Sequence, residues 1–118
     1  MGTVQIKRIY EPAEKTDGAR ILVDRLWPRG ISKESAHLDE WMKDIAPTAD
    51  LRKWFNHDVA KWYEFNLRYV LELKQNTTVK ALLDIIKSHK TVTLLYAAHD
   101  EAHNHALVLQ KYISEISG

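Results

Sequence analysis

The chain has 118 residues, and we expect residues 1–118 to form a single α/β domain that buries roughly two thirds of its unfolded surface. Its 17 basic and 16 acidic residues leave a net charge of +1, which argues against overall attraction to nucleic acid or acidic membranes, and the lack of cysteine excludes disulfides and thiolate chemistry. No stretch approaches the ~20 apolar residues of a membrane span and the start lacks a signal-peptide pattern, so we expect a cytoplasmic protein with no membrane partner.

Two strands are predicted near the start of the chain. Residues 3–10 alternate between apolar and polar side chains with the two-residue period of a strand. A loop over residues 11–19, which contains proline and glycine, leads to a second predicted strand at residues 20–25. Pro28 and Gly30 then supply the fixed and the permissive backbone angles that a turn requires.

The middle of the chain is predicted to be helical. Apolar residues between 38 and 45 recur at helical spacing, which predicts a short helix that Pro47 ends. Three further helices are expected behind the capping residues Thr48, Asp58 and Thr78. We assign a set of aromatic residues at helical spacing to the core or to a helix-to-helix interface, namely Trp41, Trp54, Phe55, Trp62 and Tyr69.

The last third of the chain predicts a strand, a loop and a helix. Residues 91–98 are apolar on both faces, which favours a central strand covered on both sides. Residues 99–104 form the loop, and Val108, Leu109 and Tyr112 lie on one face of the helix that follows. We therefore expect an α/β fold with a mostly parallel open sheet and helices packed on it in three layers, α/β/α.

Ligands of open α/β sheets bind beyond the carboxyl ends of the strands, where loops carry the side chains. The predicted strands end in groups that suit such a site: Arg8 and Tyr10 after the first, Asp24, Arg25, Trp27 and Arg29 after the second, and Tyr96 and His99 after the third. If the strands are parallel, we expect Arg8, Arg25, Tyr96 and His105 to converge on one pocket.

Asn104 and His105 occupy the start of the last predicted helix. If Asn104 caps this helix, His105 lies on its first turn and faces the sheet. Free backbone N–H groups there favour an anion, and the helix dipole lowers the pKa of a histidine, so the neutral ring can accept a proton. We expect His105 to act as general acid or base, and Asp24 to orient an arginine or activate water.

Each of these side chains also has a structural explanation. His105 can make a hydrogen bond within its loop, as most histidines at helix starts do. Asp24 can form a buried ion pair with Arg25 or Arg8 that fixes the strand register, and Trp27 can cover the core. The sequence leaves both sets of explanations open.

Metal and cofactor sites are not predicted. His99, His103 and His105 suggest a metal centre, but the first two lie in a loop and only Asp100 and Glu101 are acidic neighbours. The chain has no glycine-rich phosphate loop and no G-x-S-x-G segment. We therefore expect neither a bound metal nor a cofactor.

Four segments follow one another along the chain: KRIYEPAEKTDGARILVDRLWPRG, LDEW, LRKWF and TLLYAAHDEAHNHALVL. With them the chain resembles the YeaO-like branch of the bacterial proteins grouped as domain of unknown function 488. The resemblance implies a small α/β domain without an established activity. It also implies that Asn104, His105 and Ala106 stand where the wider family has Cys-His-Arg, and that Asp24 and Arg25 loosely match an Asp-x-Arg segment. A methyltransferase label attached to this branch finds no support in these residues.

Three functions remain open from the sequence. The first is an enzyme that acts on a phosphate-bearing or other anionic small molecule or nucleotide. The second is a non-catalytic module that binds an anion with the same arginines and Trp27, for which nucleic acid is a less favoured partner. The third is a structural protein that forms an oligomer through aromatic helices, which Trp54→Ala or Trp62→Ala would break.

Overall fold

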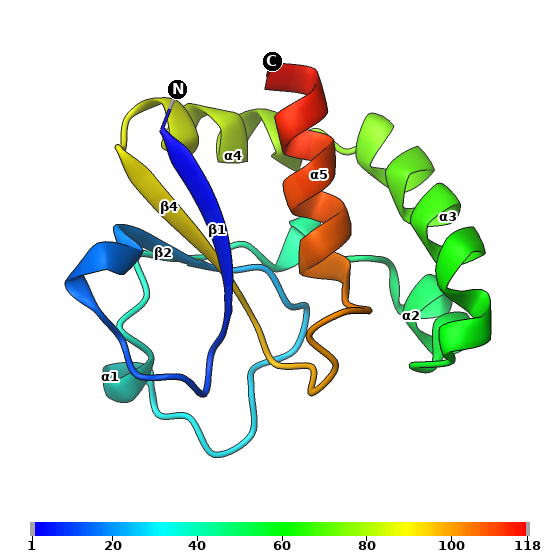
Figure 1. The fold of residues 1–118 in the computed structure, drawn as a ribbon, viewed down its shortest axis with the longest axis horizontal. Helices are drawn as coiled ribbons and strands as arrows, with labels where there is room; N and C mark the ends of the chain where they lie inside the picture. Colours follow the sequence, from blue (N-terminus) through cyan, green and yellow to red (C-terminus); the bar gives the residue numbers. More distant parts are fainter. Residues whose placement is uncertain (1, 118) are drawn as a thin grey trace.

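A parallel sheet organises the chain. The computed structural model describes residues 2–117, and within them four strands pair in the order β1-β4-β2-β3, every pair parallel (Figure 1). The strands are β1 (Thr3–Arg8), β2 (Ala19–Leu22), β3 (Glu40–Trp41) and β4 (Thr91–Tyr96). This arrangement confirms the α/β class and the parallel sheet.

The strand β4 lies between β1 and β2, as its apolar character on both faces predicts. It pairs with β1 along its full length and with four residues of β2. The strand β2 ends at Leu22, earlier than predicted, although the N–H of Val23 still donates to the carbonyl of Leu95 at 3.0 Å. The carboxyl ends of β1, β2 and β4 therefore meet at one edge of the sheet.

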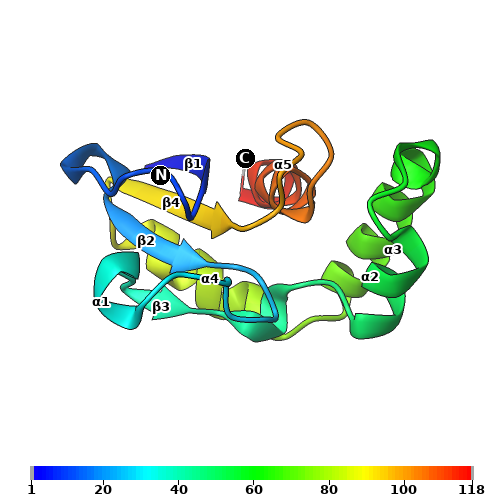
Figure 2. The same cartoon turned by 90° about the horizontal axis from the view of Figure 1, so that it is seen from below.

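The helices cover the two faces of the sheet unequally. They are α1 (Lys33–Ala36), α2 (Ala49–Phe55), α3 (Trp62–Lys74), α4 (Thr78–Lys87) and α5 (His105–Ser117). Residues of α2 to α5 share one buried cluster with the sheet, whereas the second face is covered by α1, by the short 3-10 helix Lys15–Asp17 and by loops. Both views place α3 at the outer edge of the molecule, beyond α5 (Figures 1 and 2). The layer on the second face is therefore thin, although the sequence predicted helices on both faces of the sheet.

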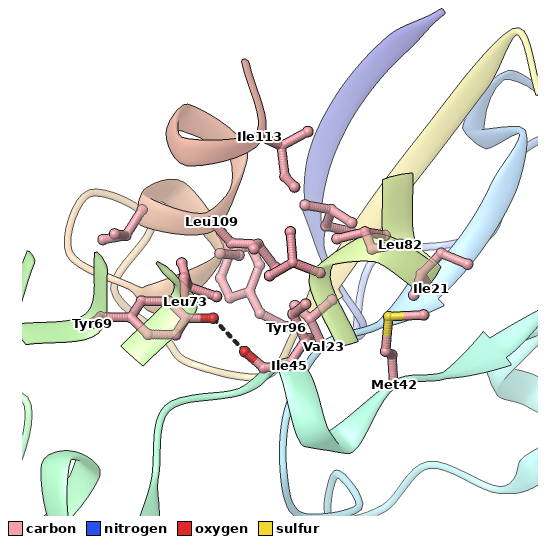
Figure 3. Close-up of a cluster of buried hydrophobic side chains, with 14 of the residues drawn as sticks. Ile21, Val23, Met42, Ile45, Tyr69, Leu73, Leu82, Tyr96, Leu109 and Ile113 are labelled. Carbon is pink, nitrogen blue, oxygen red and sulfur yellow. Dashed lines mark hydrogen bonds between the residues drawn. The ribbon is translucent and has the colours of Figure 1, made fainter. Parts of the chain in front are cut away.

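The main core joins alternate residues of β2 and β4 to the inner faces of the helices (Figure 3). Ile21, Val23 and Leu94 point from the sheet into this core because side chains alternate between the two faces of a strand. Tyr69 is completely buried there, and its hydroxyl donates to the carbonyl of Ile45 at 2.7 Å. This bond ties α3 to the segment that precedes α2.

The helix predicted for residues 38–45 is wrong. The chain forms β3 there instead, followed by the 3-10 helix Lys43–Ile45. The N–H of Asp39 donates to the carbonyl of Arg20 at 2.9 Å, and that of Met42 donates to Leu22 at 2.8 Å. These bonds satisfy the edge of β2, which a helix would leave without partners, so sheet pairing overrides the helical spacing of the side chains.

Two of the three predicted helix caps in the middle of the chain are confirmed. The side chain of Thr48 accepts from the N–H of Leu51 at 3.2 Å and begins α2. Asp58 accepts from Ala60 at 3.0 Å and begins the 3-10 helix Val59–Lys61, which continues into α3. Thr78 is not the cap of α4. Thr77 holds the cap position without a side-chain bond, and the side chain of Asn76, one residue earlier, accepts from the N–H of Thr78 at 2.8 Å.

A buried ionic cluster lies on the second face of the sheet. Asp17 pairs with Arg20 of β2 and, at 3.0 Å, with Lys7 of β1. Arg20 also donates to the carbonyls of Ala36 and His37 at the end of α1. Burial alone would raise the pKa of Asp17, but hydrogen bonds from the backbone of Glu14 and from both cations lower it below its usual range.

None of the helices within residues 2–117 combines the length and the apolar character needed to cross a membrane.

Candidate functional site

A cavity of 630 Å³ opens beyond the carboxyl ends of β1, β2 and β4. Its walls come from the loops that follow these strands, from the start of α5 and from one side of α2 and α3. This is the position that the topology of an open parallel sheet favours for a ligand.

The cavity gathers seven of the nine predicted site residues: Tyr10, Asp24, Arg25, Trp27, Arg29, Asn104 and His105. Arg8 and Tyr96 do not line it. Arg8 instead donates to the carbonyls of Ala98 at 2.8 Å and Ala97 at 3.2 Å, so it holds the loop after β4 from behind. Tyr96 packs in the main core, where burial is the main cause of its raised pKa.

Asp24 and His105 meet at the inner wall of the cavity. The Nε2 atom of His105 lies 2.9 Å from the carbonyl oxygen of Val23 and 3.2 Å from Oδ1 of Asp24. The other carboxylate oxygen of Asp24 accepts from the N–H of Ala97 at 3.0 Å. Oδ1 itself is buried and makes no hydrogen bond within residues 2–117. Asp24 thus links the end of β2 to the loop after β4 and to the start of α5.

These contacts assign the proton of the His105 ring. A carbonyl oxygen can only accept, so Nε2 carries the hydrogen, and in the neutral ring Nδ1 is the basic nitrogen. Nδ1 makes no hydrogen bond within the described residues 2–117. The pair has the orientation in which a carboxylate and a carbonyl hold an imidazole ready to accept a proton.

Three arginines line the cavity, but they are not equivalent. Arg25 donates to the carbonyls of Pro47 at 3.2 Å and Ala46 at 3.1 Å, so it also fastens the segment before α2. The side chains of Arg29 and Arg52 are exposed and make no hydrogen bond or ion pair within residues 2–117. These two guanidinium groups are free to bind an anion.

The aromatic wall is fixed by hydrogen bonds to the backbone. The indole N–H of Trp27 donates to the carbonyl of Ile31 at 2.7 Å, and its ring meets the edge of Trp41 with centroids 5.3 Å apart. The hydroxyl of Tyr10 donates to the carbonyl of Arg29 at 2.9 Å. Both rings therefore shape the loop after β2, so packing is part of the role of Trp27.

Asn104 caps α5, as predicted. Its side-chain oxygen accepts from the N–H of Leu107 at 3.0 Å, and its amide donates to the carbonyl of Asp100 at 3.0 Å. Asp100 accepts from the backbone of Ala102 and from the backbone and ring of His103. The bond from Ala102 is the largest cause of the lowered pKa of Asp100. The loop before α5 is therefore held by its own hydrogen bonds, none of which involves His105.

The histidines around the cavity do not form a metal cluster. His103 pairs with Asp100 at 2.9 Å and its ring meets the edge of Trp62, while His105 donates to Val23. Within residues 2–117, no group of three or more histidine, aspartate or glutamate side chains is placed to hold a metal ion.

Sequence reasoning missed the wall that α2 and α3 supply. Arg52, Phe55, His57 and Phe65 all line the cavity. The two phenylalanines looked like core residues and do lie in the core, so their spacing gave no sign of a second role. Asn56 and His57 have φ values of 45° and 55°, and this left-handed turn after α2 brings His57 to the cavity. The signal that could have located this turn is Asn56, because asparagine is, after glycine, a residue that adopts the left-handed conformation just past a helix end.

The lining residues within 2–117 include no serine, threonine, cysteine or lysine. The one carboxylate, on Asp24, is engaged by Ala97 and lies against His105. The position before His105 is held by Asn104, both ends of whose side chain bond to the backbone. The described lining therefore offers imidazole rings, which can act as acid, base or nucleophile, but no serine, threonine, cysteine or lysine nucleophile.

A family model described as "Inactive DUF488-N3 subclade" matches residues 3–117. The chain is 48% identical over 114 residues to the uncharacterized protein YeaO of Escherichia coli strain K12, covering 96% of this chain and 98% of the relative. It is 37% identical over 111 residues to the uncharacterized protein Rv3073c of Mycobacterium tuberculosis strain H37Rv, covering 94% and 93%. No solved structure gives a significant match. The chain therefore belongs to the YeaO-like DUF488 proteins, within the subclade described as inactive.

Proposed function

We propose that this protein binds a small anionic molecule in the cavity beyond the strand ends, without forming a covalent intermediate. One observation carries the proposal: Arg29 and Arg52 face the same cavity from different elements, and neither has a partner within residues 2–117. A phosphate or carboxylate held between them would receive charge-assisted hydrogen bonds from both guanidinium groups.

The local charge favours an anion although the whole chain is nearly neutral. The described lining holds three arginines against one carboxylate, and the net charge of the protein is +1. The positive charge is therefore concentrated at the cavity, where apolar walls focus its field. An extended nucleic-acid strand would need a longer basic surface, so an enclosed small molecule is the better fit.

The walls indicate a ligand with an apolar part. Phe55 and Phe65 are 6% and 2% exposed and form the deep side of the cavity, whereas Arg29 and Arg52 stand at its exposed side. A volume of 630 Å³ falls in the range of small-molecule sites, about 300 to 1,000 Å³. A nucleotide or an aromatic phosphate ester has both an apolar ring and an anionic group, which match the apolar and the arginine sides of the cavity.

Binding is favoured over catalysis by the chemistry of the lining. Covalent catalysis most often uses a serine, threonine, cysteine or lysine nucleophile, and the described lining supplies none of these, while its one carboxylate is already engaged. The family description of the matching subclade as inactive agrees with this reasoning. A second candidate is hydrolysis in which Nδ1 of His105 activates a water molecule, favoured by the orientation of its ring against Val23 and Asp24.

The test compares Arg52 with its neighbour Lys53. Both lie on α2, and both glutamine substitutions remove one positive charge, but only Arg52 lines the cavity. Isothermal titration with inorganic phosphate, AMP and phenyl phosphate should show binding to the wild type and to Lys53→Gln. Arg52→Gln and Arg29→Gln should each bind about tenfold more weakly, which corresponds to about 1.4 kcal/mol. Equal losses in Arg52→Gln and Lys53→Gln, or no binding by the wild type, would contradict the proposal.

The same protein samples separate the two candidates. A binding protein should leave AMP and phenyl phosphate unchanged over a day while still binding them. Release of inorganic phosphate that His105→Gln abolishes, with binding retained, would favour the hydrolytic candidate instead.

A further inference from the structure

The deep side of the cavity is an aromatic wall. The rings of Phe55 and Phe65 stack on each other there, with centroids 4.3 Å apart and an angle of 22° between their planes. Trp62 packs against both rings from behind the lining, with centroids 5.9 Å from Phe55 and 5.8 Å from Phe65. The three rings hold one another in place, so this wall is apolar and already formed before a ligand enters.

The inner wall also carries the only carboxylate among the described lining residues. Oδ1 of Asp24 is buried and makes no hydrogen bond within residues 2–117, while its second oxygen accepts from the N–H of Ala97. An anion placed beside Asp24 would be repelled by this charge. The start of α5 offers little compensation, because Asn104 already caps it by accepting from the N–H of Leu107. The deep part of the cavity therefore disfavours a phosphate.

The free positive charges lie at the mouth of the cavity instead. Arg29, in the loop after β2, and Arg52, on α2, are exposed and make no hydrogen bond or ion pair within residues 2–117. The third arginine of the lining, Arg25, is half-buried and turns its guanidinium to the carbonyls of Ala46 and Pro47. An anion is therefore best held at the mouth, between Arg29 and Arg52.

We propose that the ligand is a phosphate ester of a flat aromatic ring that enters ring first, so that its phosphate stays at the mouth and can carry a further group. This inference rests on the anion binding proposed above and adds the direction of binding and the ligand class. The ring lies against Phe55 and Phe65, the phosphate lies between Arg29 and Arg52, and its remaining oxygens face solvent. A cavity that enclosed the phosphate would accept monoesters alone, whereas this one accepts diphosphates and diesters as well. Nucleoside diphosphates, and nucleotides joined through phosphate to a second group, form the class.

A series of adenine compounds tests the exposed phosphate, with isothermal titration of the full chain. ADP should bind at least as tightly as AMP, because its added phosphate extends into solvent beside the two arginines. The methyl ester of AMP should bind no more than about tenfold more weakly than AMP, since it loses one charge but still fits. Inorganic phosphate should bind at least about tenfold more weakly than AMP, because it makes no contact with the aromatic wall.

The neutral nucleoside separates the two sides of the cavity. Adenosine should bind more weakly than AMP, and Arg52→Gln should leave its affinity unchanged because adenosine has no anion for Arg52 to hold. The same variant should weaken AMP about tenfold, whereas the matched control Lys53→Gln should weaken neither compound. Both positions are exposed, so both variants should melt with the wild type.

The direction of binding can be read from AMP itself. In saturation-transfer NMR, ligand protons that lie closest to the protein receive the most saturation. The adenine ring protons should therefore show the strongest effect, and the ribose protons next to the phosphate the weakest. The opposite order would place the phosphate deep and the ring outside, and would overturn the proposal.

The outcomes distinguish this inference from the anion binding on which it rests. A wild type that binds AMP but binds both ADP and the methyl ester more than about a hundredfold more weakly encloses the phosphate. That result would overturn ring-first binding and leave anion binding in the cavity intact. A wild type that binds none of the phosphate compounds would contradict anion binding itself, and the inference would fall with it.

Discussion

Oδ1 of Asp24 and Nε2 of His105 lie 3.2 Å apart, and this contact joins the residue after β2 to the first residue of α5. The second oxygen of Asp24 is held by the N–H of Ala97, at the end of β4. One carboxylate thus fixes the relative position of three elements that surround the cavity. The arrangement serves stability and the shape of the site together.

Asp24→Asn should destabilise the fold by about 1 to 2 kcal/mol. One oxygen of Asp24 accepts from the N–H of Ala97, and the other lies 3.2 Å from Nε2 of His105, whose hydrogen points to the carbonyl of Val23. An amide has one oxygen, so in either orientation its NH₂ group opposes a donor. Urea unfolding measures the change, and Asp84→Asn, at an exposed position on α4, is the control. An Asp24→Asn protein as stable as that control would show that the contact contributes little.

Arg25→Lys should lower the free energy of unfolding by about 1 kcal/mol or more, because an ammonium group cannot reach both carbonyls as the planar guanidinium does. The carbonyls belong to Ala46 and Pro47. Thermal unfolding should show the loss, while Arg29→Gln melts with the wild type since its side chain has no partner within residues 2–117. A loss of ligand binding in Arg25→Ala therefore cannot be separated from its effect on the fold, so Arg52→Gln is the better probe.

The sequence predicts most of the sheet and the place of the site. The alternation of apolar and polar residues predicts β1, and a segment that is apolar on both faces predicts β4 as a central strand. Both patterns follow directly from which faces of a strand are buried. Because the strands are parallel, their carboxyl ends lie together, and seven of the nine predicted residues line one cavity there. The strand β3 was missed, because its two residues are specified by the open edge of β2 and not by their own pattern.

The exact lining was less predictable, for physical reasons. Arg8 follows β1 as expected, but nearby backbone carbonyls bind its guanidinium behind the wall. Arg52 and Phe55 reach the cavity because α2 folds back toward the strand ends, a tertiary arrangement that no local spacing encodes. Position along the chain thus predicts proximity to a site better than it predicts orientation toward it.

Asp17→Asn should cost about 3 kcal/mol at neutral pH, because it weakens the pairing of Arg20, whose side chain is buried. The pKa of Asp17 is lowered in the folded state. Its contribution is therefore present above the unfolded pKa of about 4 and is lost as the pH falls through the lower, folded value. Unfolding measured from about pH 7 to pH 2 should be less pH-dependent in Asp17→Asn than in the wild type. Equal pH dependence in the two proteins would contradict the lowered pKa.

Tyr69 should remain neutral in the folded protein at high pH. Burial raises the pKa of its hydroxyl well above the usual range, and the hydroxyl donates to Ile45. Because the folded pKa is raised, the stabilisation holds below the unfolded pKa of about 10 and is lost as the pH rises above it. In an alkaline titration followed by tyrosinate absorbance, exposed Tyr63 should ionise first and Tyr69 only as the protein unfolds. Tyr69→Phe should reduce that last component, to which buried Tyr96 also contributes, and lower stability by about 1 to 2 kcal/mol.

The central place of β4 also sets the order in which the chain can fold. β1 and β2 do not pair with each other, and β4, which joins them, begins only at Thr91. During synthesis the sheet cannot close until β4 has left the ribosome, so the edges of β1 and β2 that pair with β4 stay unpaired until then. Such distant pairing slows folding, and a fragment that stops before Thr91 should aggregate instead of forming a smaller version of this fold.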